Sequence, residues 1–397
     1  MDTTLGWATL LTHGDVDPEE PGVISPPLHQ SVNYAAATAE QFTELNERIQ
    51  PPRYYRRFGN PTQARLEELL AKAEGADAAL ATASGMGAVT TTLLTLLSAG
   101  DHVVAQHSMY GGTLSMLRTL GKRFGIEVSF VDQTDTAAFE ASITDRTKLF
   151  MLETPSNPLL ALTDLDSVAA LARARGILTW VDNTVATPIN QKPLDHGVDL
   201  VMHSLTKAIG GHADLQAGVL IGRAELVERL WLTHTMVGAV TSPFDAWLAL
   251  RGLRTLAMRV EWQNRSAQSV ADYLAGRPEV LKVNYPGLAT HPQHELARRQ
   301  MRGYGCLLSF EVDGGRPAAE RLIAALHLAA RAPSLGGTTT TIVRPAAMWS
   351  NELTEEQLAT AGVPSGLIRF AVGLEDQGDL IADLDQAFAS LPPVGRA

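Results

Sequence analysis

LTWVDN at 178–183 and LVMHSLTKAIGGHAD at 200–214 give the strongest indication of the fold. Each begins as a short apolar run and ends in polar residues. Similar runs, separated by helix-like segments, occur on either side of them: HVVA at 102, VSFV at 128, KLFMLE at 148 and AGVLIG at 217. This alternation is typical of a mostly parallel sheet flanked by helices. The sequence therefore predicts an α/β protein.

The texture of the chain divides it into three parts. Residues 1–59 have little periodicity and several prolines, so we expect an extended arm that needs another surface, such as a neighbouring subunit, to lie against. Residues 60–257 form a large domain, which opens with a helix from Pro61 to Glu74, capped by Asn60 and stopped by Gly75. Residues 258–397 combine a long helical stretch with the runs CLLSFEV and LIRFAVGLE, which predicts a smaller α+β domain.

Composition narrows the class of partner. The 397 residues are 45% hydrophobic, which is enough for a sizeable core, and the net charge is -11. Without a cluster of Lys and Arg, we expect neither nucleic acid nor a membrane surface as a partner. The first basic residue is Arg48 and no apolar run is long enough to span a bilayer, so we expect a cytoplasmic protein that binds small molecules.

Metal and disulfide chemistry find little support. The single cysteine, Cys306, cannot form an internal disulfide or a cysteine-based zinc site, and its surroundings resemble a buried strand. The pairs His102 with His107 and His203 with His212 lack the context of metal ligands. We expect no metal and interpret these side chains as structural.

An aspartate and a lysine follow two neighbouring runs of the predicted sheet. Asp182 ends the run LTWVD, and Lys207 comes just after LVMHS. Ligands of open parallel sheets bind at the carboxyl ends of the strands, so both side chains can reach one crevice. Pyridoxal 5'-phosphate (PLP) needs such a pair, because its aldehyde condenses with a lysine and its ring nitrogen needs a carboxylate. A strand-end aspartate and a surface lysine are the alternative for either residue alone.

ATASGMGAVTTTLLTLL at 81–97 provides a glycine turn that opens a helix, where free N–H groups and the helix dipole favour a phosphate. Gly85 and Met86 would donate these N–H groups, and the hydroxyls of Ser204 and Thr206 could add to them. The same turn is compatible with close helix packing or with part of a nicotinamide-binding turn. However, Thr90 stands where G-x-G-x-x-G requires its third glycine.

Nine blocks along the chain carry a family resemblance: YYRRFGNPT at 54–62, ASGMGA at 83–88, MYGGT at 109–113, ETPSNP at 153–158, VDNT at 181–184, HSLTKAIGGHAD at 203–214, SPFDAWLALRGLRTL at 242–256, SLGG at 334–337 and LIRFAVGLED at 367–376. In these blocks the sequence resembles the family of cystathionine γ-synthase, cystathionine γ-lyase and methionine γ-lyase, which are PLP-dependent enzymes of sulfur amino-acid metabolism. The resemblance implies the aspartate-aminotransferase-like fold (fold type I). It also implies a homotetramer built from two dimers with shared active sites.

The resemblance, carried over position by position, assigns roles to the cofactor residues. Lys207 would form the Schiff base and later move protons, and Asp182 would partner the pyridine nitrogen. Tyr110 would stack on the ring and act as acid or base near the leaving group, and Asn157 would contact the phenolic oxygen of the ring. The phosphate would be bound by Gly85, Met86, Ser204 and Thr206 and, from the adjacent subunit, by Tyr55 and Arg57.

Arg369 is the candidate for binding substrate. In LIRFAVG the apolar residues Ile368, Phe370 and Val372 share one face of the strand, so Arg369 should face a cleft. The resemblance implies that this arginine grips the substrate α-carboxylate by a two-pronged hydrogen bond, supported by Ser334. A structural salt bridge is the alternative.

Several positions depart from the family pattern where substrate is chosen. Thr339 replaces a glutamate that cystathionine-handling members carry after SLGG, and Gly112 stands where methionine γ-lyases have cysteine. Val185 and Ala208 replace aromatic residues, and Arg344 replaces a histidine before PA. These changes open space and add a positive charge, so we hypothesise a larger or more acidic substrate or nucleophile, with Thr339 and Arg344 among the substrate-binding residues.

The sequence thus predicts a PLP-dependent enzyme that performs γ-replacement or γ-elimination on an L-amino acid of the O-acylhomoserine or methionine type. A cystathionine β- or γ-lyase is the alternative within the same chemistry. From other classes, a nicotinamide-dependent oxidoreductase would use SGMGAV as its pyrophosphate turn, but would leave Asp182, Lys207 and Arg369 unexplained. A non-catalytic binding protein would have little need for that set.

Overall fold

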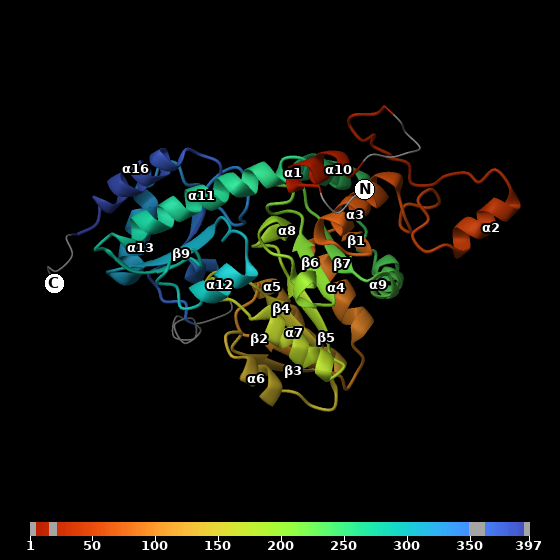
Figure 1. The fold of residues 1–397 in the computed structure, drawn as a ribbon, viewed down its shortest axis with the longest axis horizontal. Helices are drawn as coiled ribbons and strands as arrows, with labels where there is room; N and C mark the ends of the chain where they lie inside the picture. The colour runs from red at the N-terminus through yellow and green to blue at the C-terminus, as the bar shows by residue number, and fades with distance from the viewer. Residues whose placement is uncertain (1–4, 16–21, 349–361, 393–397) are drawn as a thin grey trace.

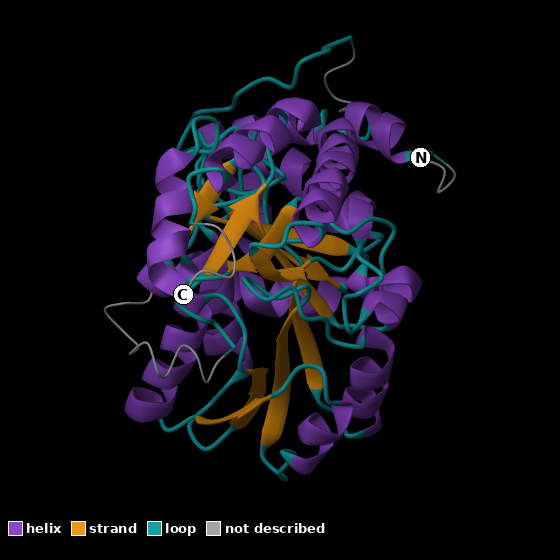
Figure 2. Ribbon diagram, turned by 90° about the vertical axis from the view of Figure 1, so that its left-hand side faces the viewer, coloured by secondary structure: helices purple, strands orange, loops and turns teal. Residues whose placement is uncertain are grey.

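The computed structural model describes residues 5–15, 22–348 and 362–392. It contains two β-sheets, one of seven strands and one of four, and helices cover both (Figures 1 and 2). None of its described helices combines the length and the apolar character that crossing a membrane requires.

The larger sheet confirms the predicted mostly parallel arrangement. Its order is β1-β7-β6-β5-β4-β2-β3. β7 runs antiparallel to both of its neighbours, and the other pairs are parallel. The strands are β1 (Ala78–Thr82), β2 (His102–Gln106), β3 (Glu127–Val131), β4 (Thr147–Glu153), β5 (Leu178–Asp182), β6 (Leu200–Ser204) and β7 (Gly218–Gly222).

Both faces of the central strands of this sheet are buried, which explains why β4, β6 and β7 are nearly continuous apolar runs. Val104 and Val181 pack on the face covered by α3, α6, α7 and α10, whereas Val103 and Trp180 pack on the face covered by α4, α5 and α9. The helices of this part are α3 (Pro61–Glu74), α4 (Gly85–Leu96), α5 (Gly111–Phe124), α6 (Thr136–Ala141), α7 (Leu165–Ala174), α8 (Thr187–Asn190), η1 (Pro193–His196, 3₁₀), α9 (Ala224–Val237) and α10 (Pro243–Leu253).

The smaller sheet is antiparallel throughout, in the order β10-β11-β9-β8. Its own core contains Phe310, Phe370 and Phe388 and is covered by α11, α13 and α16. The elements of this part are α11 (Leu256–Ala275), β8 (Val280–Asn284), α12 (His294–Gln300), β9 (Leu307–Val312), α13 (Gly315–Ala325), β10 (Thr341–Val343), α14 (Pro345–Met348), β11 (Leu367–Ala371) and α16 (Gln377–Phe388). The long helix α11 runs from α10 toward α16 (Figure 1), and the predicted domain boundary at 257/258 falls near its start. The three-part division at 59/60 and 257/258 stays a prediction.

The amino-terminal region is more regular than the sequence suggested. It holds two helices, α1 (Trp7–His13) and α2 (Ala39–Glu47). α2 extends away from the rest of the molecule (Figure 1), and none of its residues is buried. The described part of the segment between them, from residue 22 onward, contacts α10, because Trp247 Nε1 donates to the Pro26 carbonyl oxygen over 2.8 Å.

Candidate active site

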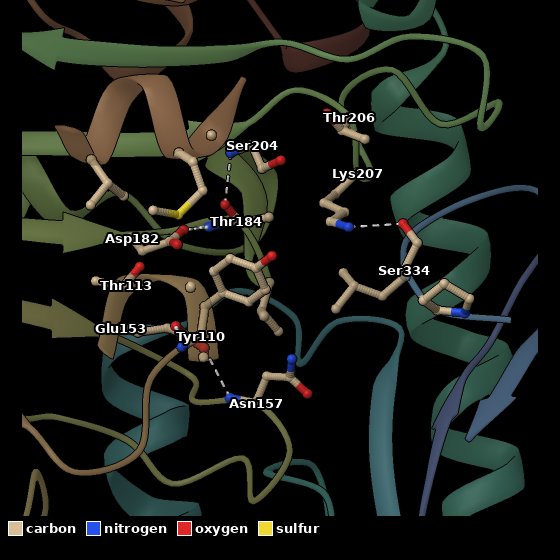
Figure 3. A pocket seen from close by; sticks show the side chains of 18 of the residues that line it. Tyr110, Thr113, Glu153, Asn157, Asp182, Thr184, Ser204, Thr206, Lys207 and Ser334 are labelled. Atoms are coloured by element: carbon tan, nitrogen blue, oxygen red, sulfur yellow. Dashed lines mark hydrogen bonds between the residues drawn. The ribbon is translucent and has the colours of Figure 1, made fainter. Parts of the chain in front are cut away.

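A cavity of about 430 Å³ opens where the carboxyl ends of the parallel strands meet the first turns of α4 and α5 (Figure 3). Its volume suits a small-molecule site. Residues in the segment before β10, including Ser334, and Arg369 of β11 close the opposite side. The fold therefore places the cavity at the sheet edge that the sequence predicted.

Two carboxylates form the floor of this cavity. Asp182 ends β5 and Glu153 ends β4, and the two residues are partners in the strand register. Asp182 Oδ1 accepts a hydrogen bond of 3.0 Å from the backbone N–H of Thr184, which orients the carboxylate. Burial raises the pKa of Asp182. A cationic ring nitrogen placed against it would favour the charged form, so this carboxylate fits the partner that PLP requires.

Lys207 lies on the turn that follows β6. Its backbone N–H donates to Ser204 O, and its Nζ donates to Ser334 Oγ over 2.9 Å. Burial, and then the nearby Arg369 guanidinium, lower the pKa of Lys207, while Asp182 acts in the opposite direction. A lowered pKa increases the fraction of unprotonated amine, which is the form that condenses with an aldehyde.

The next turn of the chain is held by a buried arginine. Arg259 of α11 donates to the carbonyl oxygen of Ala208 over 2.6 Å and to that of Gly252 over 2.7 Å. The backbone approaches this guanidinium closely at Gly211, whose φ is +76° and where an added Cβ would clash with Arg259 Nη1. Arg259 thus fixes the backbone immediately after Lys207.

The first turn of α4 and the end of β6 together form an anion cradle. Ser84 Oγ caps the helix by accepting from Gly87 N–H, and the intrahelical bonds begin with Ala88 N–H to Ser84 O. The N–H groups of Gly85 and Met86 therefore have no acceptor within the helix. A Cβ on Gly85 would lie 3.2 Å from Ser204 Oγ, so this glycine lets the helix terminus and the hydroxyl approach each other. This arrangement fits a phosphate group.

Tyr110 and Asn157 line the cavity beside Glu153 (Figure 3). Tyr110 precedes α5, and its ring lies so close to Gly112 that a Cβ there would be 2.6 Å from Tyr110 Cε1. Thr206 is in the wall next to Lys207, where its hydroxyl is hydrogen-bonded to the backbone of Ala217. These predicted cofactor residues therefore border one space.

Arg369 is 3% exposed and lines the same cavity. Its Nη2 donates to the Ser334 carbonyl oxygen over 2.9 Å, and its buried Nε has no hydrogen-bond partner among the described residues. Burial lowers the pKa of Arg369 to about 10. Ser334 has φ +82°, a strained conformation for a residue with a Cβ, of the kind that clusters at functional sites. Donor capacity thus remains for a carboxylate in the cavity.

Comparison with known proteins agrees with this geometry. The model of the Cys/Met metabolism PLP-dependent enzyme family matches residues 8–389. The chain belongs to this family. Enzymes of this family depend on PLP, so the predicted cofactor is confirmed. The alternatives of a nicotinamide-dependent oxidoreductase and of a non-catalytic binding protein are therefore set aside.

Among individual relatives, the chain is 42% identical to the L-methionine gamma-lyase of Pseudomonas putida, over 96% of this chain and 97% of that protein. It is 45% identical to the O-succinylhomoserine sulfhydrylase of Pseudomonas aeruginosa, over 86% and 85% respectively. The crystal structure of cystathionine gamma synthase from Xanthomonas oryzae pv. oryzae, in complex with aminoacrylate and cysteine, has a TM-score of 0.91 and 38% identity. The match covers 98% of this chain and 100% of the Xanthomonas chain. These similarities confirm the predicted fold type I.

Four residues that the sequence analysis predicted for the site do not line the cavity of this chain. Tyr55 is 41% exposed, and Arg57 Nη1 donates to the Thr235 carbonyl oxygen on α9 over 3.1 Å. Thr339 is exposed. Arg344 Nη2 is 3.3 Å from Glu320 Oε1 and forms an ion pair with it. Arg344 thus does not line the cavity among the described residues, and its predicted contact with substrate stays a prediction.

Other residues line the cavity although the sequence analysis assigned them no role: Glu153, Gln216, Pro333 and Met348. Glu153 could have been found, because it ends an apolar run two runs before Lys207 and the carboxyl ends of parallel strands converge. Pro333 and Met348 come from segments without a periodic signal, so the sequence offered no comparable indication.

The histidines discussed above have protein partners. His203 Nε2 is 2.6 Å from Glu74 Oε1, and the ring of His102 is hydrogen-bonded to Thr147 and Ser129. Within the part of the chain that the structure describes, no three His, Cys, Asp or Glu side chains gather as metal ligands would.

Proposed function

We propose that this protein binds PLP through Lys207 and acts at Cγ of an L-amino acid, by γ-replacement or γ-elimination. One observation carries the proposal: Lys207, Asp182, the free first turn of α4 and Arg369 border a single cavity. The alternatives, a surface role for Lys207 and a structural salt bridge for Arg369, do not account for this convergence. The names of the relatives support the reaction class, since they include a γ-lyase and a sulfhydrylase.

The residues present fit the cofactor. Gly85, Met86, Ser204 and Thr206 would bind the phosphate, Asp182 would bind the ring nitrogen, and Asn157 would bind the phenolic oxygen. Bound PLP supplies a conjugated cation that takes up the negative charge developing at the substrate carbons. A fixed, desolvated carboxylate suits this task, because its interaction with a cation is stronger in the cavity than in water.

The remaining chemistry belongs to the side chains. The guanidinium of Arg369 would bind the substrate α-carboxylate, with Ser334 beside it, and so fix Cα near Lys207. The Lys207 amine would take the proton from Cα, which its lowered pKa favours, because a larger fraction of the amine is then unprotonated and able to act as a base. The phenol of Tyr110 would exchange a proton with the group that leaves from Cγ.

The substrate type is the finer part of the proposal. Among the described residues that line the cavity, Lys207 and Arg369 carry the positive charge. Arg344 ion-pairs with Glu320 outside the cavity, so the hypothesis of an acidic substrate loses the charge that motivated it. Val185 does line the cavity, which keeps the space for a bulkier group. We therefore propose O-acylhomoserine or methionine as the substrate type.

We further propose a homotetramer of two shared-site dimers, working in the cytoplasm. Tyr55 and Arg57 would bind the phosphate of a neighbouring subunit, which is consistent with their distance from the cavity of their own chain. Exposed apolar side chains near the arm support this assembly: Ile24 is 87% exposed and Met236 of α9 is 76% exposed. Such surfaces are typical of subunit contacts.

Product analysis tests the function. The PLP-loaded protein is given O-acetylhomoserine, O-succinylhomoserine or methionine, with and without a thiol. A 2-oxo acid and ammonia indicate elimination, and a new thioether indicates replacement. Arg369→Met should lower kcat/KM by about a hundredfold because the carboxylate loses a bidentate charged partner. Arg146→Met is the control, because Arg146 pairs with Glu127 at the surface and does not line the cavity, and it should retain activity. Wild-type protein that converts none of these substrates would contradict the proposal.

A further inference from the structure

Glu153 is a buried carboxylate for which the proposed reaction has so far given no task. It ends β4, is 3% exposed and lines the cavity next to Asp182, its partner in the strand register. The backbone carbonyl of Glu153 accepts a hydrogen bond of 2.7 Å from Gln106 Nε2, which anchors the end of the strand. The position of the carboxylate is therefore well determined by the fold.

The two carboxylate oxygens bind two different loops. Oε2 accepts from the backbone N–H of Tyr110 over 2.6 Å, and Oε1 accepts from the backbone N–H of Asn157 over 3.0 Å. Tyr110 belongs to the loop between β2 and α5, whereas Asn157 belongs to the loop that follows β4. One side chain thus links the loop that carries the ring-stacking tyrosine to the loop that carries the asparagine.

A carboxylate suits this double contact, because both of its oxygens can accept a hydrogen bond. Its burial next to Asp182 has a cost in free energy. An ionised carboxylate is an acceptor at both oxygens, whereas the amide of glutamine offers one acceptor and one donor. Burial, and then the charge of Asp182, raise the pKa of Glu153 to about 8, while the two backbone N–H groups lower it. A second negative charge beside Asp182 is unfavourable, so the ionised form of Glu153, which accepts both N–H groups, gains further when a cationic ring bound against Asp182 offsets the charge of that carboxylate.

We propose that Glu153 is a positioning residue that fixes Tyr110 and Asn157 against the bound cofactor by accepting both backbone N–H groups. The inference rests on the proposed function, since it requires PLP in this cavity. Without these two hydrogen bonds, the ring of Tyr110 and the amide of Asn157 could shift independently of each other. The asymmetry of the cofactor environment would then decrease.

Glu153→Gln and a matched control test this role. The control is Glu67→Gln, because Glu67 is also buried, accepts a backbone N–H (from Ala81, 2.8 Å) and has a raised pKa, but does not line the cavity. The measurements are the dissociation constant for PLP and the visible circular dichroism per bound cofactor. Glu153→Gln should weaken PLP binding about tenfold and reduce the ellipticity, because one N–H loses its acceptor. Glu67→Gln should leave both quantities at wild-type values, even if its melting temperature falls.

A second variant covers the case in which Glu153→Gln does not fold. Glu153→Asp keeps the charge but is one methylene shorter, so it cannot span both N–H groups, and the same loss of ellipticity is expected. Wild-type ellipticity and affinity in the folded Glu153 variants, or equal losses in Glu67→Gln, would overturn the positioning role alone. Wild-type protein that takes up no PLP would overturn both this inference and the proposed function.

Discussion

Lys207 has a reactivity that its surroundings set. Burial and Arg369 lower its pKa, so a larger fraction of its amine is unprotonated than in a free lysine at the same pH. Replacing Arg369 by methionine removes one of the two causes and should raise the pKa of Lys207. The midpoint of the pH profile for PLP incorporation into apoenzyme should therefore move to higher pH, as stopped-flow absorbance would show. Arg344→Met is the control and should not move the midpoint; an unchanged or lower midpoint in Arg369→Met would contradict the assignment.

Asp182 should matter for turnover far more than for folding. Asp182→Asn keeps the shape but removes the negative charge that would hold the ring nitrogen protonated, and we expect kcat to fall by about 10²–10³-fold. Asp199→Asn is a suitable control, because Asp199 precedes β6 and accepts hydrogen bonds from Thr179 without lining the cavity. Near-normal kcat in Asp182→Asn would be incompatible with the proposed partner of the ring.

At the scale of elements, the cap of α3 is a direct link between sequence and stability. Asn60 Oδ1 accepts from Thr62 N–H over 2.9 Å, and its Nδ2 donates to the His29 carbonyl oxygen over 2.8 Å. Asn60→Ala removes both bonds and should lower the free energy of unfolding by about 1–2 kcal/mol, measured by denaturant titration. Thr38→Ala, which removes the cap of the exposed helix α2, should change it by less than about 0.5 kcal/mol. Equal losses in the two variants would contradict the role of the α3 cap.

The sequence predicted the elements whose periodicity is decided locally. Strands β2 to β7 are mostly apolar runs between turn residues. The helix α3 has its start signal, Asn60, and its stop signal, Gly75 with φ +76°, in the sequence. β1 was missed because AALAT consists mainly of alanine, which has a weak strand preference, and its strand state depends on pairing with β7. The helices α1 and α2 were missed because they are only 7 and 9 residues long and so show little periodicity.

The site residues likewise divide into those that a local strand pattern predicted and those whose contacts depend on the tertiary fold. Lys207, Asp182 and Arg369 were predicted because each one adjoins a recognisable strand. Arg344 could not be judged from sequence, since its ion pair with Glu320 joins segments that come together in the tertiary fold. The double contact of Glu153 likewise depends on two loops whose proximity no local pattern encodes. For RPAAMWSNELTEEQ at 344–357 the sequence predicts a loop that enters a capped turn, and the part of this block from residue 349 onward lies outside the described residues.

At the scale of the whole molecule, the shared active site can be tested by mixing inactive variants. Arg57→Ala would damage the neighbour's site, whereas Lys207→Ala would damage its own. If subunits from the two variants are unfolded and refolded together, mixed dimers hold one intact site each, and about a quarter of wild-type activity should return. Each variant refolded alone is the control. No recovery in mixtures that form mixed dimers would place Arg57 outside the neighbouring site.

The most direct test of the central claim is to find which residue carries the cofactor. The PLP-loaded protein is reduced with borohydride, which makes the lysine linkage permanent, then digested and analysed by mass spectrometry. We predict a phosphopyridoxyl group on Lys207, within the peptide that contains HSLTKAIGGHAD. Its absence from Lys207, or its presence on another lysine that survives in Lys207→Ala, would contradict the assignment.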